Sequence, residues 1–455
     1  MDDLWRHVFQ YFTTRERIRY ERVSTKWMKL LREYWKQLDT VDTDRLCNSE
    51  PIERWSDCVQ AVLVRCSSHI KWFSFGRGHL KTDCLNTKKP LPSEVLVLLA
   101  EKAPSLRSFR VEEQVFCLER CTVDCSDPNF ITSCFLSLLD NCLTLEEFVI
   151  TLVILARMPW KDDEKEWHAS KSETKSLDAH EETAAVLDSS NGSLCIDDNF
   201  MEHMPSTVSI LCLATGEAVR IKNANFVPKL KKLRLFDAQY SFMSLKPLRD
   251  LVNNAPNLLY LDLSNSPFIG DFSPIGKLSQ LRCLLLNGNC IYLEDGQLSA
   301  IIEGCELLEV LSLERCSKLS NEGLKIISRC TILKELHLAG VTGVTDDTLT
   351  SITFNIPLLK VLDISYCKSL TSKGLESLAM LQNLNHLCVN GIHDFDDRLV
   401  NMIRLGRPHC IIEALHCRYS MSMDELFRMQ VAFFQSIVEP ESIRSTYQLS
   451  RYQYI

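Results

Sequence analysis

A short apolar pattern recurs through the second half of this 455-residue chain. Each copy opens with an L-x-L-like core, as in "LEVLSL" at residues 308–313, and closes with apolar residues at helical spacing. Consecutive cores are 23 to 28 residues apart, and weaker copies occur at Leu211 and Leu415. The clear copies start at Leu233, Leu261, Leu284, Leu311, Leu336, Leu362 and Leu387. This period is typical of a leucine-rich repeat.

A second register supports the same interpretation, because a small or apolar residue lies six positions before most of these leucines. These residues are Ala255, Leu278, Cys305, Cys330, Ile356 and Leu381. One strand–turn–helix unit cannot bury its own leucines, but stacked units form a parallel sheet on a concave side and helices on a convex side. We therefore predict an α/β leucine-rich-repeat solenoid. Strand alternation should point Leu311 and Leu313 inward and Ser312 and Glu314 outward.

Weaker units precede the regular ones, with aromatic residues in place of leucine. They read "IKWFSF" (70–75), "LRSFRV" (106–111) and "LEEFVI" (145–150). We predict repeats over residues 60–418, irregular over 60–155 and regular over 206–418. Residues 419–455, which include the helical pattern "MDELFRMQVAFFQSIV", should form a C-terminal cap and tail.

The repeat pattern disappears between residues 160 and 205, a segment that contains 12 Asp or Glu residues and 4 Lys residues. We predict a disordered acidic insertion, because the segment has too little apolar surface to offset the entropy of ordering. A regulatory phosphorylation loop is the alternative. The difference of −8 equals the formal net charge of the whole chain, so the remainder is close to neutral. That balance argues against a nucleic-acid-binding protein.

Twenty cysteines and an acidic N-terminus without a signal-like apolar run predict free thiols in the cytoplasm or nucleus. No run of 18 apolar residues is present, so no membrane span is expected. No CxxC occurs, and we interpret most cysteines as small buried hydrophobes rather than metal ligands. Metal and cofactor sites are therefore not predicted. The absence of P-loop, GxSxG, HExxH and GxGxxG motifs predicts no catalytic residues and a protein that is not an enzyme.

The first forty residues form a different unit of three short predicted helices. An apolar stripe marks the first helix, Thr13 or Thr14 can cap the second, and Ser24 can cap a third that ends near Leu38. Such a small core usually leans on a partner. The stretches "VFQYF" (8–12), "VSTKW" (23–27) and "WKQL" (35–38) make residues 1–40 resemble an F-box. Met1 stands where the family has the proline of a Leu-Pro pair, which leaves either a shortened chain or weaker docking.

An F-box followed by leucine-rich repeats is similar to the F-box/leucine-rich-repeat proteins. The resemblance implies a non-catalytic substrate receptor of a Skp–cullin–F-box ubiquitin ligase, which binds a Skp adaptor, through it a cullin scaffold, and a protein substrate destined for ubiquitination and degradation. The implied adaptor-binding residues are Leu4, Val8, Phe9, Phe12, Val23, Trp27 and Trp35.

The substrate itself cannot be named from the sequence. Polar side chains expected on the concave face are candidate contacts, although a merely solvated sheet face would have the same composition. They are Arg234, Asp262, Glu314, His337, Asp363 and His386. A leucine-rich-repeat scaffold that binds partners without any ligase is the alternative function.

Overall fold

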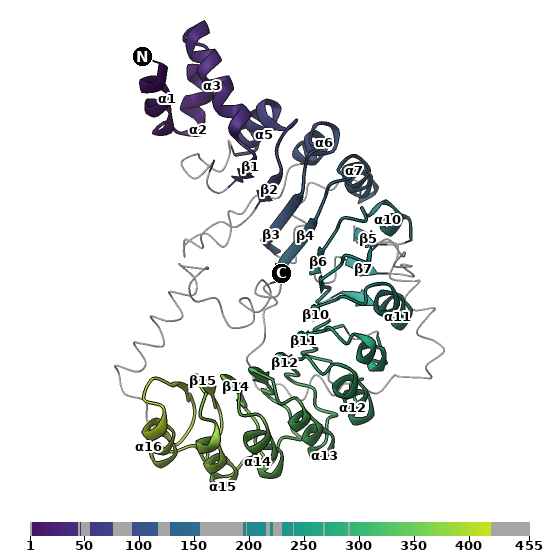
Figure 1. The fold of residues 1–455 in the computed structure, drawn as a ribbon, viewed down its shortest axis with the longest axis vertical. Helices are drawn as coiled ribbons and strands as arrows, with labels where there is room; N and C mark the ends of the chain where they lie inside the picture. The colour runs from purple at the N-terminus through teal and green to yellow at the C-terminus, as the bar shows by residue number, and fades with distance from the viewer. Residues whose placement is uncertain are drawn as a thin grey trace.

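The chain forms a curved solenoid in which parallel strands line the inner side and helices line the outer side (Figure 1). This computed structural model describes residues 2–43, 46, 55–75, 93–116, 128–154, 194–196, 198–214, 219–221, 230–239, 241–266, 269–289 and 292–419. The predicted α/β leucine-rich-repeat solenoid is confirmed. Three helices stand at its N-terminal end (Figure 1).

One parallel sheet of 13 strands runs the length of the solenoid in the order β1-β2-β3-β4-β6-β8-β10-β11-β12-β13-β14-β15-β16. Its strands are β1 Thr40–Asp42, β2 Trp72–Phe75, β3 Ser108–Phe116, β4 Glu147–Ile154, β6 Ile210–Ala214, β8 Leu235–Asp237, β10 Tyr260–Asp262, β11 Cys283–Leu285, β12 Val310–Ser312, β13 Glu335–His337, β14 Val361–Asp363, β15 His386–Cys388 and β16 Ile411–Glu413. A second parallel sheet contains β5 Leu194–Ile196, β7 Val219–Ile221 and β9 Phe242–Met243.

Short helices or 3₁₀ segments connect most consecutive strands of the large sheet, and three more helices precede β1. The helices are α1 Asp2–Gln10, α2 Thr14–Tyr20, α3 Thr25–Gln37, α5 Trp55–Cys66, α6 Ser93–Lys102, α7 Pro128–Asn141, α10 Asp198–His203, α11 Leu245–Asn254, α12 Asp295–Gly304, α13 Asn321–Leu324, α14 Asp346–Asn355, α15 Ser372–Leu375 and α16 Asp397–Gly406. The 3₁₀ segments are η7 Ser273–Lys277, η8 Lys325–Arg329 and η9 Glu376–Met380. Within the described ranges, none of the helices is long and apolar enough to span a membrane.

The leucines of successive repeats are aligned as the repeat pattern predicts. Leu261, Leu284, Leu311 and Leu336 pair in register on neighbouring strands and belong to one continuous core between sheet and helices. Two predicted anchors are wrong by three residues. Phe236, not Leu233, pairs with Leu261, and Ile412, not Leu415, pairs with Leu387. Leu233 is buried ahead of β8, whereas Leu415 is exposed after β16.

The irregular N-terminal repeats use aromatic residues where the regular ones use leucine. Phe73 on β2 stacks on Phe109 of β3 with ring centroids 5.8 Å apart, and Phe109 stacks on Phe148 of β4 at 5.6 Å. The sheet also begins earlier than the predicted residue 60, because β1 pairs with β2 through Val41 and Phe73. The helical unit therefore continues directly into the solenoid.

Cysteines occupy fixed positions in the repeat, as their register predicts. Cys305 and Cys330 are buried in the common core. After three other strands, a thiol donates a hydrogen bond to a backbone carbonyl of the preceding repeat. These contacts are Cys316 to Leu286 at 3.3 Å, Cys367 to Leu338 at 3.3 Å and Cys417 to Val389 at 3.1 Å. The 13 cysteines whose side chains the structure describes are free thiols.

The predicted acidic insertion, 160–205, extends too far toward the C-terminus. Residues 194–196 form β5, and α10 follows at Asp198–His203. Phe200, Met201 and Met204 are buried in the common core, so this end of the segment has the apolar surface that ordering requires. Residues 160–193 lie outside the described residues, as do residues 420–455 of the predicted cap and tail.

A left-handed residue follows each strand from β10 to β16. Glycine supplies it at Gly288, Gly340 and Gly391, with φ near +70°. Asn265, Arg315, Tyr366 and His416 adopt the same conformation with φ of 55–60°. Glycine and asparagine tolerate this region, whereas arginine, tyrosine and histidine enter it at a cost in backbone energy. The turn is therefore imposed by the stacked repeats rather than by local preference.

Close packing of the outer helices provides a test of this architecture. Gly304 ends α12, and a Cβ atom there would overlap the carbonyl oxygen of Gly276 in η7. Gly304→Ala should lower the free energy of unfolding by about 1–3 kcal/mol, as overpacking usually does. Chemical denaturation measures the change.

Gly296→Ala is the matched control, because Gly296 lies in the same helix and a Cβ there would meet nothing within 4 Å. This variant should be neutral or stabilising by up to about 1 kcal/mol, since alanine is the better helix former. Equal stability of the two variants would contradict the close packing of α12 on η7.

Candidate functional site

Side-chain caps start the second and third of the N-terminal helices. The Thr13 backbone N–H donates to Glu16 Oε2 at 2.8 Å, and the Glu16 backbone N–H donates to Thr13 Oγ1 at 3.2 Å. This reciprocal capping box starts α2. Ser24 Oγ accepts from the Trp27 backbone N–H at 3.1 Å and starts α3. The predicted caps at Thr13 and Ser24 are confirmed.

A small core lies inside these helices. Phe9, Leu30 and Leu31 are buried together, and partly buried aromatic residues pack around them. The Trp27 ring lies 5.3 Å from Phe9 and 4.8 Å from Trp5, centroid to centroid. Because the Trp27 side chain packs against this core, only part of its surface is available to another protein.

The residues expected at an adaptor interface therefore separate into three groups. Leu4 and Val23 are exposed, at 64% and 58% of their full surface. Val8, Phe12 and Trp27 are half-buried, whereas Phe9 and Trp35 are buried. Phe9 and Trp35 are consequently core residues, which the shared aromatic pattern did not distinguish from surface residues. Tyr11, which follows α1 and was not predicted, is also exposed.

Trp35 joins the helical unit to the repeats. Its ring belongs to the common core of the solenoid, and its Nε1 donates to Glu21 Oε1 at 2.5 Å. Arg65 of α5 binds the same carboxylate, with Nη2 2.8 Å from Glu21 Oε2. The three helices therefore pack on the first repeat and cover the N-terminal end of its core.

The concave face of the sheet has an apolar and a polar part. An apolar cluster, separate from the common core, follows β4 to β12 and contains Val149, Ile210, Cys212, Leu235, Tyr260, Cys283, Leu285 and Val310. Titratable side chains lie beyond this apolar cluster on the same face, toward the C-terminal end of the solenoid. We call them the polar cluster, and they are Glu314, His337, Asp363, His386, Cys388 and Glu413.

Parallel register brings the polar cluster together. His337 pairs with Asp363, Asp363 with Cys388, and Cys388 with Glu413 on successive strands. The ligand atoms of Glu314, His337 and Asp363 lie within 4.8 Å of one another.

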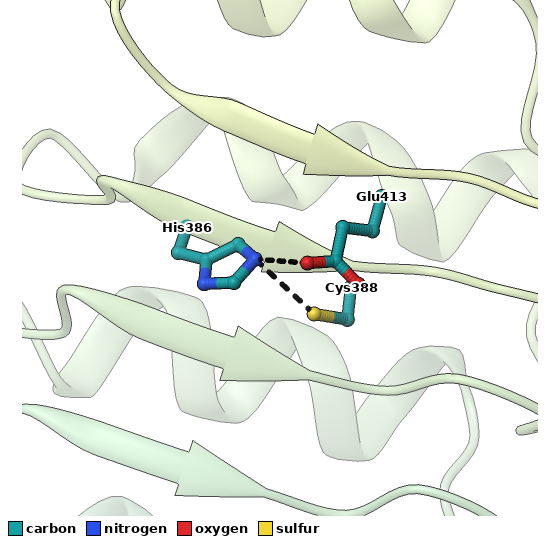
Figure 2. Close-up of side chains that lie close together, drawn as sticks. All are labelled: His386, Cys388 and Glu413. Carbon is teal, nitrogen blue, oxygen red and sulfur yellow. Dashed lines mark hydrogen bonds and ion pairs between the residues drawn. The ribbon is translucent and has the colours of Figure 1, made fainter. Parts of the chain in front are cut away.

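The second half of the polar cluster lies on β15 and β16. The ligand atoms of His386, Cys388 and Glu413 also lie within 4.8 Å of one another. Figure 2 shows these three side chains pointing toward one another. His386 Nε2 lies 2.8 Å from Glu413 Oε1 and 3.6 Å from Cys388 Sγ.

Burial controls the charges in this region. It lowers the pKa of His337 to about 3, assisted by the nearby His386, so the His337 imidazole is neutral at physiological pH. Burial raises the pKa of Asp363, while the hydrogen bond from His386 lowers the pKa of Glu413. Burial and the neighbouring carboxylates raise the pKa of the Cys388 thiol, which therefore stays protonated at physiological pH.

Four of the six predicted concave residues meet in the polar cluster, namely Glu314, His337, Asp363 and His386. Asp262 lies further along the face, buried, and its Oδ1 accepts from the Ser264 backbone N–H at 3.0 Å. Arg234 was misplaced by the three-residue register error, since it precedes β8 and is exposed at the start of the strand. Sequence analysis missed Cys388 and Glu413. Two features of the sequence could have indicated them. Strand alternation within "HLC" (386–388) places Cys388 on the same face as His386, and Glu413 follows Cys388 by one repeat.

No protein-family model matches this sequence. Among solved structures, a chain of the yeast Rad7–Elc1 complex is 16% identical with a TM-score of 0.46, covering 88% of this chain and 92% of that chain. The internalin InlF of Listeria monocytogenes is 14% identical with a TM-score of 0.39, covering 73% and 91%. A chain of the mouse RP105/MD-1 complex is 14% identical with a TM-score of 0.38, covering 82% and 59%. Similarity at this level assigns no function.

The carboxyl of Glu335, beside the polar cluster, provides a test of how burial shifts pKa values in this region. Burial raises the pKa of its carboxyl to about 7, and its Oε2 atom has no hydrogen-bond partner among the described residues. The folded chain thus holds this proton more tightly than the unfolded chain does. Stability contributed by Glu335 should be complete below pH 4.5 and fall as the pH rises toward 7.

Glu335→Gln removes this titration. The variant should be more stable than the wild type by about 1–3 kcal/mol at pH 8 and show little gain at pH 4, as denaturant titrations at both pH values would measure. The same substitution at Glu322, which is exposed, serves as the control. A gain that does not change with pH would contradict a buried carboxyl at position 335.

Proposed function

We propose that this protein is the substrate receptor of a Skp–cullin–F-box ubiquitin ligase. The observation that carries the proposal is a capped three-helix unit that buries its own small core and leaves Leu4 and Val23 exposed. Both side chains face solvent and are therefore available to a partner protein. A Skp adaptor is the partner that the F-box-like stretches of the sequence imply.

The attachment of this unit to the repeats suits a receptor. Trp35 and the Glu21–Arg65 ion pair hold the three helices against the first repeat. An adaptor bound to the helices and a substrate bound to the repeats would then keep a defined separation. The receptor contributes position rather than bond chemistry, because holding a substrate lysine near the transfer site raises its effective concentration.

The concave face is the proposed contact surface for a protein substrate. Leucine side chains occupy the other face of the sheet, so only the inner row of side chains can meet a partner there. The polar cluster combines acidic and imidazole groups at the edge of the apolar part. Its carboxylates and His386 are half-buried, whereas His337 is buried. A scaffold without a ligase would use the same face, so the adaptor interaction decides between the two functions.

Substitution of the two exposed residues tests the adaptor interaction. Leu4→Asp combined with Val23→Asp should weaken binding to a purified Skp adaptor. Each lost apolar contact costs about 1.5–3 kcal/mol, so the pair should reduce affinity by roughly several hundred-fold or more. Fold should be retained because both side chains already face solvent. Immobilised-adaptor binding assays measure the affinity.

Leu405→Asp is the matched control, because Leu405 is an exposed leucine, 88% accessible, at the opposite end of the solenoid. It should leave adaptor binding unchanged. If the wild-type chain fails to bind a Skp adaptor at micromolar concentration, the receptor function is wrong and the scaffold function replaces it.

A further inference from the structure

We propose that His386, Cys388 and Glu413 form a zinc-binding site on the concave face of the solenoid. The three residues lie on β15 and β16, with Cys388 and Glu413 directly paired in register. His386 precedes Cys388 by two residues, so strand alternation places both side chains on the same face. Figure 2 shows the imidazole, thiol and carboxylate converging on one point. This site extends beyond the proposed receptor function and does not depend on it.

The ligand spacing suits a tetrahedral ion. Zinc binds sulfur at about 2.3 Å and imidazole nitrogen at about 2.0–2.1 Å, which puts the two donors about 3.6 Å apart at a tetrahedral angle. Cys388 Sγ and His386 Nε2 are separated by 3.6 Å. His386 Nε2 and Glu413 Oε1 are 2.8 Å apart, a hydrogen-bond distance that must widen to about 3.4 Å when both atoms bind the ion. Rotation of the glutamate side chain supplies that movement.

The donor set selects the metal. Magnesium and calcium prefer oxygen ligands alone, whereas a thiolate, an imidazole and a carboxylate together suit zinc. The side chains of His386 and Glu413 are 27% and 32% exposed, so an ion can enter from the concave side. Three protein ligands leave a fourth position open to that side for water.

The surroundings of the thiol are acidic. Asp363, Glu413 and Glu314 all act electrostatically on Cys388 and disfavour its thiolate. The same carboxylates attract a divalent cation. Asp363 Oδ1 accepts a hydrogen bond from the Ser365 backbone N–H at 2.9 Å. Its carboxylate can therefore contribute negative charge to the zinc site without breaking that hydrogen bond.

Binding exchanges protons for the ion. The Cys388 thiol loses its proton to solvent as the sulfur–zinc bond forms. His386 must present an unprotonated Nε2, so its remaining ring proton resides on Nδ1. The Glu413 carboxylate gives up the hydrogen bond with His386 and binds the ion instead.

The test uses the full-length chain, reduced and freed of metal with a chelator. Zinc affinity is measured by competition with a chromophoric chelator, and cobalt(II) is added separately to detect a sulfur-to-cobalt charge-transfer band. The wild type should bind one more zinc ion per chain than Cys388→Ser. Loss of an outer contact to a metal ligand costs about 10–100-fold in affinity, so loss of the thiolate itself should cost at least about 100-fold and remove the band due to this site.

Cys417→Ser is the matched control, because Cys417 is another half-buried thiol in the same part of the solenoid and lies outside the polar cluster. It should keep the zinc stoichiometry and the cobalt band of the wild type. Glu413→Gln should weaken zinc binding while the cobalt–sulfur band persists at saturating cobalt, since the thiolate is still present.

Circular dichroism checks that each variant is folded. If Cys388→Ser is unfolded, His386→Gln and Glu413→Gln decide the question, because each removes one ligand and keeps the approximate side-chain volume. Weaker zinc binding in either folded variant supports the site. Zinc stoichiometry and affinity equal to the wild type in all folded variants would overturn it, as would equal loss in Cys417→Ser.

Discussion

Burial of one row of leucine-type side chains between the sheet and the outer helices is the interaction on which the structure depends. The rows lie at the spacing of neighbouring strands, about 4.8 Å, so each leucine covers the next. Leu284, Leu311 and Leu336 illustrate this contact in the regular part. No repeat has a complete core alone, and the first repeat needs a cover at its open end. Trp35 and α3 provide part of that cover.

The same constraint leaves the inner face of the sheet available for chemistry. Side chains there alternate with the leucines and do not hold the helices in place. In-register parallel pairing aligns residues about one repeat apart in the sequence, so Asp363, Cys388 and Glu413 become neighbours on three strands. Burial raises the pKa of Asp363, whereas the hydrogen bond with His386 lowers the pKa of Glu413, so neighbouring carboxylates on this face titrate differently. A face built in this way can bind a protein, an ion or both.

Sequence patterns predicted the repeats well where the L-x-L core is regular and less well at its ends. Leu233 was chosen because it stands in "LRL", but the true anchor is Phe236, whose ring fills the place of a leucine. Leucines three residues apart both belong to the repeat, so spacing alone does not separate them. The error displaced Arg234 from the concave face. Likewise, an aromatic residue in a short helix has the same pattern whether it faces a core, as Phe9 does, or a partner.

The amino-acid sequence by itself determined the solenoid, the caps of the N-terminal helices and the buried state of the repeat cysteines, because all three depend on contacts at a fixed spacing along the chain. Only the tertiary structure decided which apolar residues of the first forty stay exposed and that Trp35 belongs to the repeats. It also decided that His386, Cys388 and Glu413 share one point in space. These outcomes depend on how separate elements pack and on side-chain direction, and local periodicity does not specify either of them.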